Sequence, residues 1–96
     1  MSNADIVTVW VSISGRVQRV GFRYWVIDQA GERGLNGWVR NVQAGDVEAV
    51  FSGARADVEM MIALCHDGPA NARVDSVQQK IIDESPEQGF HYLPTV

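Results

Sequence analysis

The chain has 96 residues, of which 46% are hydrophobic, and carries 8 basic against 12 acidic side chains, a formal net charge of −4. This size and composition predict one small domain over residues 1–96 with a single modest core. The acidic balance argues against nucleic-acid binding, which requires a basic face, and no apolar run is long enough to span a membrane. The only cysteine, Cys65, excludes an internal disulfide. Because the first five residues lack the basic and apolar regions of a signal peptide, we expect a cytoplasmic protein.

Apolar residues recur with the periods of strands and helices along the whole chain. Ile6–Ile13 alternates apolar and polar residues, as a half-buried strand does. Phe22–Arg33 repeats apolar residues every four positions, as the buried face of a helix does, and Gly34 is suited to end it. The second predicted helix, Ala54–Asp67, has its apolar face at Val58, Met61, Ile62 and Cys65. The remaining predicted strands are Leu35–Val42, Val47–Ser52, Val74–Asp83 and Phe90–Val96.

This order, β-α-β-β-α-β with a short extra strand, predicts a ferredoxin-like α+β fold. We expect a two-layer sandwich in which two helices cover one face of an antiparallel sheet. The other face would be open to water, which suits the polar positions Thr8 and Ser12 and leaves Trp10 as a surface aromatic. Gly45 would take positive φ in the hairpin turn 43–46, and Pro94 confines the last strand to an edge.

Positive charge gathers between the first strand and the first helix, in the segment Gly15-Arg16-Val17-Gln18-Arg19-Val20-Gly21-Phe22-Arg23. It holds three of the eight basic residues, and no acidic residue occurs from Ile6 to Ile27. Backbone N–H groups at a helix N-terminus form a natural anion site, and the arginine fork can add two parallel hydrogen bonds to a phosphate. The alternative is an ordinary strand-to-helix turn with arginines on its surface.

In a second segment, Gly37 to Gly53, Asn41 is the residue without an evident structural role. Trp38 would pack in a strand, Gly45 make the hairpin and Gly53 end the third strand. An asparagine near a strand end offers both a donor and an acceptor and can hold a water molecule. It can equally initiate a turn by bonding to its own backbone.

Both segments resemble the signatures of the acylphosphatases. The first reads G-x-V-Q-G-V-x-F-R in that family and departs here only at Arg19, where the family has Gly; the second agrees throughout. The resemblance implies hydrolysis of the carboxyl–phosphate bond of acyl phosphates. It implies that Arg23 anchors the phosphoryl group and that Asn41 orients the attacking water. The phosphate-binding loop it implies consists of Gly15, Arg16, Val17, Gln18, Arg19 and Val20, with the amides of residues 16–20 as the cradle.

Arg19 leaves three possibilities open. If the family's glycine is needed for positive φ, arginine costs about 1–2 kcal/mol at this position. If the glycine only makes room, Arg19 is a neutral surface residue. If the side chain reaches the anion, it strengthens binding.

We expect no metal, because His66 and His91 have no companions at ligand spacing, and the resemblance implies no cofactor. The expected partners are a small acyl phosphate as substrate and inorganic phosphate as product and inhibitor, with a monomeric protein, no nucleic acid and no membrane. A non-catalytic anion-binding or regulatory module on the same fold is the alternative function. Nucleic-acid binding by the open sheet face is a third, which the acidic balance disfavours. A related domain also occurs in larger hydrogenase-maturation carbamoyltransferases.

Overall fold

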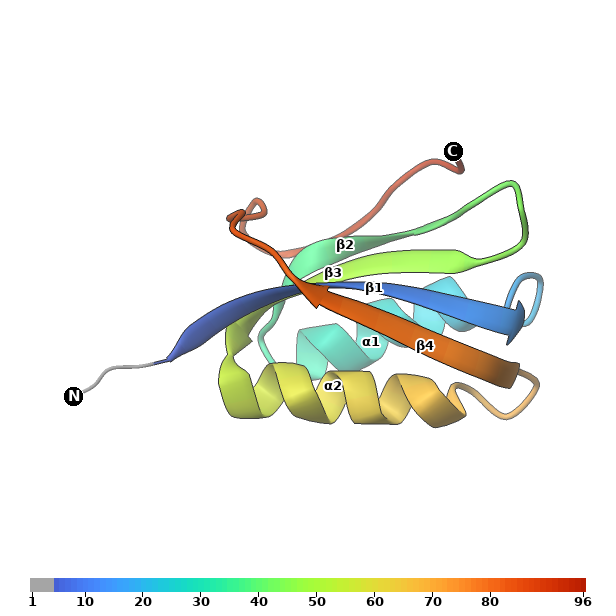
Figure 1. Cartoon of the computed structure of the whole chain (residues 1–96), viewed down its shortest axis with the longest axis horizontal. Coiled ribbons are helices and arrows are strands. Elements are labelled where there is room, and N and C mark those ends of the chain that lie inside the picture. Colours follow the sequence, from blue (N-terminus) through green and yellow to red (C-terminus); the bar gives the residue numbers. More distant parts are fainter. Residues whose placement is uncertain (1–4) are drawn as a thin grey trace.

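A five-stranded sheet with two helices packed on one of its faces makes up the structure, a computed structural model that describes residues 5–96 (Figure 1). The strand order is β4-β1-β3-β2-β5. Each predicted element is present, with bounds that differ by a few residues from the expected ones. The elements are β1 (Ile6–Arg16), α1 (Phe22–Glu32), β2 (Asn36–Asn41), β3 (Val47–Ala54), α2 (Arg55–Asp67), β4 (Arg73–Ile81) and β5 (Phe90–Tyr92).

The core lies between the sheet and the helices. The inward residues of β1 are Val9, Val11 and Ile13, all buried, as the alternation predicts. The buried residues of α2 are the four expected ones, Val58, Met61, Ile62 and Cys65. Helix α1 contributes Phe22, Val26 and Ala30. No helix of the described residues is long and apolar enough to cross a membrane.

The turns form where the glycines predict them. After α1, Leu35 N–H donates to the Ala30 carbonyl and Gly34 N–H to the Gly31 carbonyl, the paired bonds of a Schellman motif. Gly34 has a φ of +66° and Gly45, in the β2–β3 hairpin, a φ of +118°. The hairpin turn brings β2 and β3 together as an antiparallel pair, with Asn41 opposite Val47 at the end near the hairpin.

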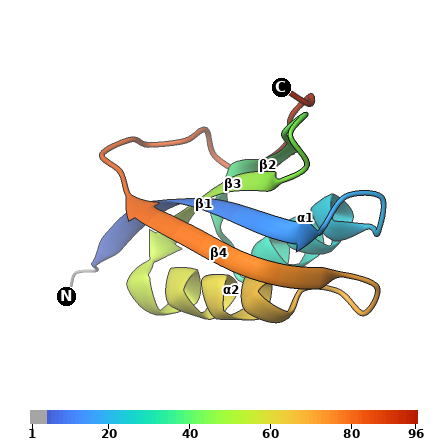
Figure 2. The ribbon, with the colours of Figure 1, turned by 45° about the vertical axis from the view of Figure 1, so that its right-hand side comes forward.

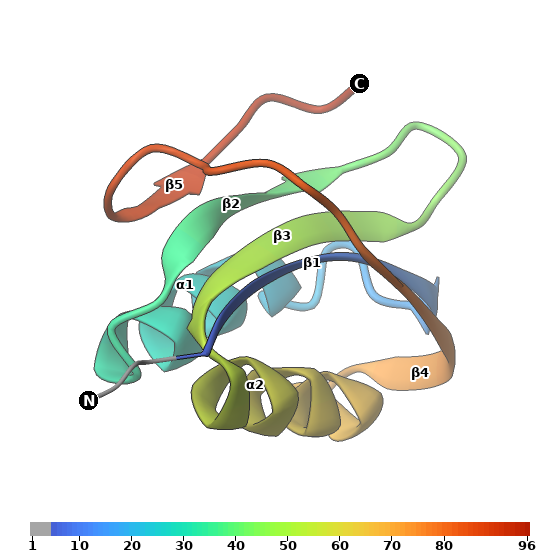
Figure 3. The ribbon, with the colours of Figure 1, turned by 60° about the vertical axis from the view of Figure 1, so that its left-hand side comes forward.

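The last strand departs from the expected antiparallel sheet. β5 covers only Phe90–Tyr92 and pairs parallel to β2. β4 and β5 lie at opposite edges, so the chain crosses the whole sheet between them and arrives running in the direction of β2 (Figure 3). Beyond Tyr92, the N–H groups of Leu93 and Val96 still donate to the carbonyls of Val39 and Asn41, which keeps the C-terminal segment along β2.

The sheet face away from the helices is less open to water than expected. Thr8 and Ser52 on this face are buried, and their hydroxyl oxygens lie 2.7 Å apart in a hydrogen bond. Trp10 is half-buried and donates its indole N–H to Glu48 at 2.7 Å. The crossing segment after β4 passes over this face, which explains why polar positions of the β1 pattern lose their access to water (Figure 3).

Candidate active site

The loop between β1 and α1 begins at a distortion of the sheet. The pairing of β1 with β4 shifts between Ser14 and Gly15, a β-bulge. Gly15 has a φ of +122°, and a Cβ there would lie 2.2 Å from the Arg73 carbonyl oxygen. The close approach of β4 therefore requires glycine at this position and fixes the direction in which the loop leaves the strand.

The loop ends at the uncapped N-terminus of α1. Gly21 is the N-cap residue, and its carbonyl accepts the first helical hydrogen bond from Trp25 N–H at 3.0 Å. No side chain caps this end and no acidic residue lies in the first turn. The partial positive charge of the helix end is therefore not neutralised locally, which favours an anion there.

Several loop amides are available to a ligand. The N–H of Val17 donates to the Gly15 carbonyl at 3.0 Å, and the Val17 side chain is buried in the core. The N–H groups of residues 18–21 donate to no other part of the chain that the structure describes. Arg16, the first residue of the expected cradle, still lies in β1, opposite Arg73 of β4.

Gln18 ties this loop to the β2–β3 hairpin. Its side-chain amide donates to the Val42 carbonyl at 2.7 Å and to the Asp46 carbonyl at 2.9 Å. Figures 1 and 2 show the loop and the hairpin at the same end of the molecule. Because Val42 directly follows Asn41, this contact brings the two sequence segments that carry the expected site residues side by side.

Asn41 is the last residue of β2, and its side chain faces the same side of the sheet as Val39, toward the helices. The residue is 9% exposed, and its Oδ1 is buried with no hydrogen-bond partner among residues 5–96. A buried unsatisfied acceptor costs about 1–3 kcal/mol. Hence Asn41 offers an acceptor that the folded chain leaves unused beside the loop.

Arg23 lies in the first turn of α1 and is half-buried. Its Cζ lies 4.6 Å from the centre of the Tyr92 ring. Within residues 5–96, none of the loop arginines Arg16, Arg19 and Arg23 forms an ion pair with a carboxylate. The loop is thus an uncompensated positive region on an acidic chain.

Arg19 has a φ of +64°, the only positive φ at a non-glycine residue in the described chain. Of the three possibilities raised by the sequence, the structure shows the first: the position adopts the left-handed conformation that a glycine accepts without strain. The side chain is exposed and makes no hydrogen bond to the described residues.

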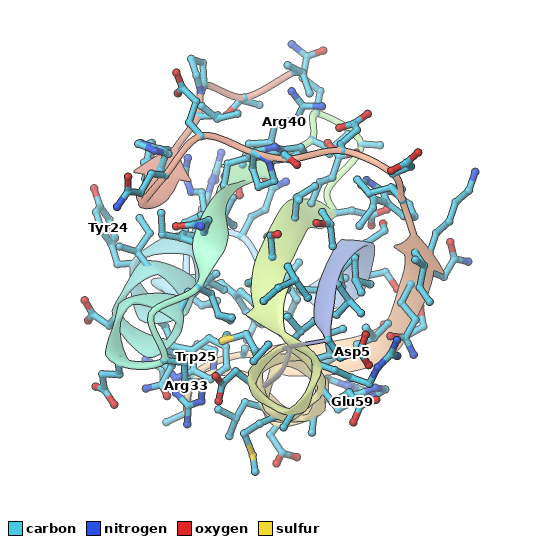
Figure 4. The ribbon with its side chains drawn as sticks, turned by 90° about the vertical axis from the view of Figure 1, so that its left-hand side faces the viewer. Asp5, Tyr24, Trp25, Arg33, Arg40 and Glu59 are labelled. Atoms are coloured by element: carbon cyan, nitrogen blue, oxygen red, sulfur yellow. The ribbon has the colours of Figure 1, made fainter. Side chains whose placement is uncertain are left out.

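The other polar groups considered in the sequence lie elsewhere. Burial raises the pKa of the Cys65 thiol from 9.0 to about 12, which agrees with an inert core residue. Residues 5–96 hold no group of three His, Cys, Asp or Glu side chains that could bind a metal. Trp10, Glu48 and Arg40 interact on the sheet face away from the helices, where Figure 4 shows Arg40. They line a cavity of about 360 Å³ that lies on the opposite side of the sheet from the Asn41 side chain.

Sequence reasoning missed Tyr92. It lies outside both motifs, and only the parallel pairing of β5 with β2 brings it to Arg23. No local pattern could have indicated this contact, because the two residues belong to elements far apart in the chain.

Comparisons with known proteins agree with this arrangement. A family model described as Acylphosphatase matches residues 9–92. The chain is 50% identical over 92 residues to an acylphosphatase of Bradyrhizobium diazoefficiens, covering 90% of this chain and 93% of that protein. The structure superposes on an acylphosphatase from Coxiella burnetii with a TM-score of 0.90 at 33% identity, covering 97% of this chain and 100% of the other.

A larger protein contains a similar unit. Full-length HypF, solved in a phosphate- and nucleotide-bound form, superposes with a TM-score of 0.89 at 25% identity, covering 98% of this chain and 13% of HypF. Since the family model spans most of the described residues and the relatives match over nearly their whole lengths, the family is established. The chain belongs to the acylphosphatase family.

Proposed function

We propose that this enzyme hydrolyses the carboxyl–phosphate bond of acyl phosphates at the loop between β1 and α1, releasing a carboxylate and inorganic phosphate. The activity follows from the family, and the assignment of roles to residues is our proposal. The observation that carries it is the buried, unpartnered Oδ1 of Asn41 beside a loop with free amides.

In the proposed mechanism the phosphoryl group binds in the segment 15–20, and Arg23 anchors it. The unpaired N–H groups at residues 18–20, with that of Gly21 beside them, would donate hydrogen bonds to the oxygens that gain charge in the transition state. Arg23 adds a planar pair of donors from the first helical turn. Gly15 and Val17 fix the path of the loop, and Arg16 and Arg19 add positive charge around it.

Asn41 orients the attacking water in this proposal. Its Oδ1 would accept a hydrogen bond from the water and place the water oxygen toward phosphorus. The amides, the arginines and Asn41 do not take up a proton at neutral pH. We therefore assign the water proton to an oxygen of the substrate's own phosphate group. Acyl phosphates are already activated, so positioning and electrostatic stabilisation suffice as the main sources of acceleration.

We also propose a cellular location, an oligomeric state and a set of ligands for the enzyme. We place the enzyme in the cytoplasm as a monomer that requires no metal or cofactor, with inorganic phosphate as product and inhibitor. The single buried thiol suits a reducing compartment, and the acidic charge balance disfavours nucleic acid as a ligand.

The test compares two substitutions in benzoyl phosphate hydrolysis. Asn41→Ala should lower kcat by roughly 10²–10³-fold while inhibition by inorganic phosphate persists. Arg23→Ala should abolish measurable turnover and weaken phosphate binding, measured by direct titration of the protein, by about 10²-fold, because it loses charge-assisted hydrogen bonds to the anion.

An arginine and an asparagine outside the proposed site, Arg33 and Asn71, serve as controls for Arg23 and Asn41. Arg33, at the other end of α1, bonds to the Gln29 carbonyl, and Asn71 is exposed. Arg33→Ala and Asn71→Ala should leave kcat unchanged. Full activity in Arg23→Ala would remove this residue from the mechanism. Joint loss of turnover and phosphate binding in Asn41→Ala would assign Asn41 a structural role.

The alternative is a non-catalytic anion-binding module. The unused acceptor of Asn41 argues for the enzyme, because a site that only binds phosphate anions needs donors. Absence of turnover in a protein that binds phosphate would support the alternative.

A further inference from the structure

The aromatic ring of Tyr92 lies against the side chain proposed to anchor the phosphate. The Cζ of Arg23 is 4.6 Å from the ring centre, within the range of a cation–π interaction. Tyr92 ends β5, where it is paired with Val39 of β2, two positions before Asn41. The contact therefore connects the first turn of α1 to the edge of the sheet.

Stacking leaves the donors of an arginine free. A guanidinium lies with its face on an aromatic ring, whereas its five N–H groups point outward in its own plane. A carboxylate partner would occupy those donors and cancel the charge. No carboxylate in the described part of the chain pairs with Arg23, and the aromatic ring is the contact that the structure records.

The ring itself is held in place from two sides. The backbone around it is bound to β2, with Leu93 N–H on the Val39 carbonyl at 3.0 Å and Val96 N–H on the Asn41 carbonyl at 3.1 Å. Tyr24 of α1 packs against the Tyr92 ring with centroids 5.6 Å apart, and Figure 4 shows Tyr24 on the side of α1 near β5.

We propose that Tyr92 is a positioning residue that holds the guanidinium of Arg23 in the orientation needed to bind the phosphoryl group. This inference rests on the proposed function, because it assigns the phosphate to Arg23. The C-terminal segment then contacts both proposed catalytic residues. Tyr92 contacts the side chain of Arg23, and the N–H of Val96 donates to the backbone carbonyl of Asn41.

The experiment measures KM and kcat for benzoyl phosphate, and the inhibition constant of inorganic phosphate, in variants at position 92. Tyr92→Leu removes the ring and should weaken phosphate inhibition and raise KM by roughly 3- to 30-fold, the range expected for a lost cation–π contact. Tyr92→Phe keeps the ring and should stay within about twofold of the parent enzyme. Tyr92→Met, which keeps apolar bulk without a ring, is the second variant if Tyr92→Leu does not fold.

Tyr24→Leu is the comparison variant, since it removes the aromatic pair but not the contact with Arg23. Because Tyr24 also supports the Tyr92 ring, this variant should weaken phosphate inhibition, but less than Tyr92→Leu does. In an Arg23→Ala background, Tyr92→Leu should have no further effect on phosphate binding measured by direct titration, because the group that the ring positions is gone.

The outcomes separate this inference from the proposed function. If Arg23→Ala weakens phosphate binding and Tyr92→Leu and Tyr92→Met do not, the positioning role is wrong and the site assignment stands. If Arg23→Ala has no effect on phosphate, the site assignment fails first. Equal weakening in Tyr92→Leu and Tyr24→Leu, or in Tyr92→Phe, would show a packing role in place of a specific contact.

Discussion

The side-chain amide of Gln18 donates to the backbone carbonyl of Val42 at 2.7 Å, across 24 residues of sequence. The same nitrogen also donates to the Asp46 carbonyl at 2.9 Å. The loop that carries the proposed anion-binding amides is thereby fixed to the hairpin that follows Asn41. Both partners are carbonyl acceptors, so the contact uses the NH₂ group of the Gln18 side chain, which supplies two donors, and not its carbonyl oxygen.

Replacement of Gln18 should therefore loosen the site as well as the fold. Gln18→Ala is expected to lower the free energy of unfolding by about 1–2 kcal/mol and to reduce kcat/KM for benzoyl phosphate, because two hydrogen bonds are lost. Urea unfolding and steady-state turnover measure the two effects. The control is Gln78→Ala on the exposed surface of β4, which should change stability by less than about 0.5 kcal/mol. Equal behaviour of the two variants would contradict the role given to Gln18.

Arg19→Gly should stabilise the protein. Removing the strain of the left-handed conformation raises the free energy of unfolding by about 1–2 kcal/mol. The greater freedom of glycine in the unfolded chain offsets part of this, leaving a net increase of roughly 0.5–1 kcal/mol. Arg19→Ala removes the same charge but keeps a Cβ at a φ of +64°, so it separates the two contributions. A urea midpoint for Arg19→Gly no higher than that for Arg19→Ala would show that the backbone is not strained.

The same variants measure whether the Arg19 charge reaches the ligand. The side chain is exposed and makes no hydrogen bond within the described residues. We expect the inhibition constant of phosphate to change by less than about threefold in both variants, as befits a solvent-screened charge. A larger and equal loss in both would assign Arg19 a direct contact with the anion.

Gly15→Ala should be far more damaging than Gly45→Ala, although both glycines have nearly the same φ, +122° and +118°. A Cβ at Gly15 would lie 2.2 Å from the Arg73 carbonyl oxygen, whereas a Cβ at Gly45 meets nothing within 4 Å. We expect a loss of about 1 kcal/mol for Gly45→Ala and of more than about 3 kcal/mol, or no cooperative unfolding, for Gly15→Ala. Comparable urea midpoints for the two variants would refute the close approach of β4 to the loop.

Cys65 should respond to pH only under alkaline conditions. Its pKa is about 12 in the folded protein against 9.0 for the free side chain, because burial disfavours the thiolate. Below about pH 9 the Cys65 thiol is protonated in both the folded and the unfolded chain, so its ionisation does not lower the stability there. Above this pH the unfolded chain loses the proton while the folded chain keeps it. Stability should fall by about 1.4 kcal/mol per pH unit between these two values on account of this group.

The measurement is urea unfolding at several alkaline pH values, with Cys65→Ala as the control that lacks this slope. The native protein should also resist thiol reagents at pH 8 and react only after unfolding. Rapid labelling of the native protein at that pH would contradict the burial of Cys65.

The local elements could be predicted because each carries its own signal. The alternation in β1 and the spacing of Val58, Met61, Ile62 and Cys65 gave the buried faces that the structure confirms. The expected open face was wrong for Thr8, which is buried, because the segment between β4 and β5, distant from β1 in the sequence, passes over this face of the sheet. The parallel pairing of β5 was likewise missed, since a strand's direction relative to β2 depends on the path of the chain before it.

The sequence alone determined the element order, the loop composition and the family, because periodicity, turn residues and motif spacing are local properties. It also singled out Arg23 and Asn41 through the two motifs. Only the tertiary structure decided that Gln18 fastens one motif to the other, that Arg19 sits at positive φ and that Tyr92 lies under Arg23. Those relationships join residues from different elements or depend on how the loop is held, so they exist only once the sheet has fixed its neighbours in space.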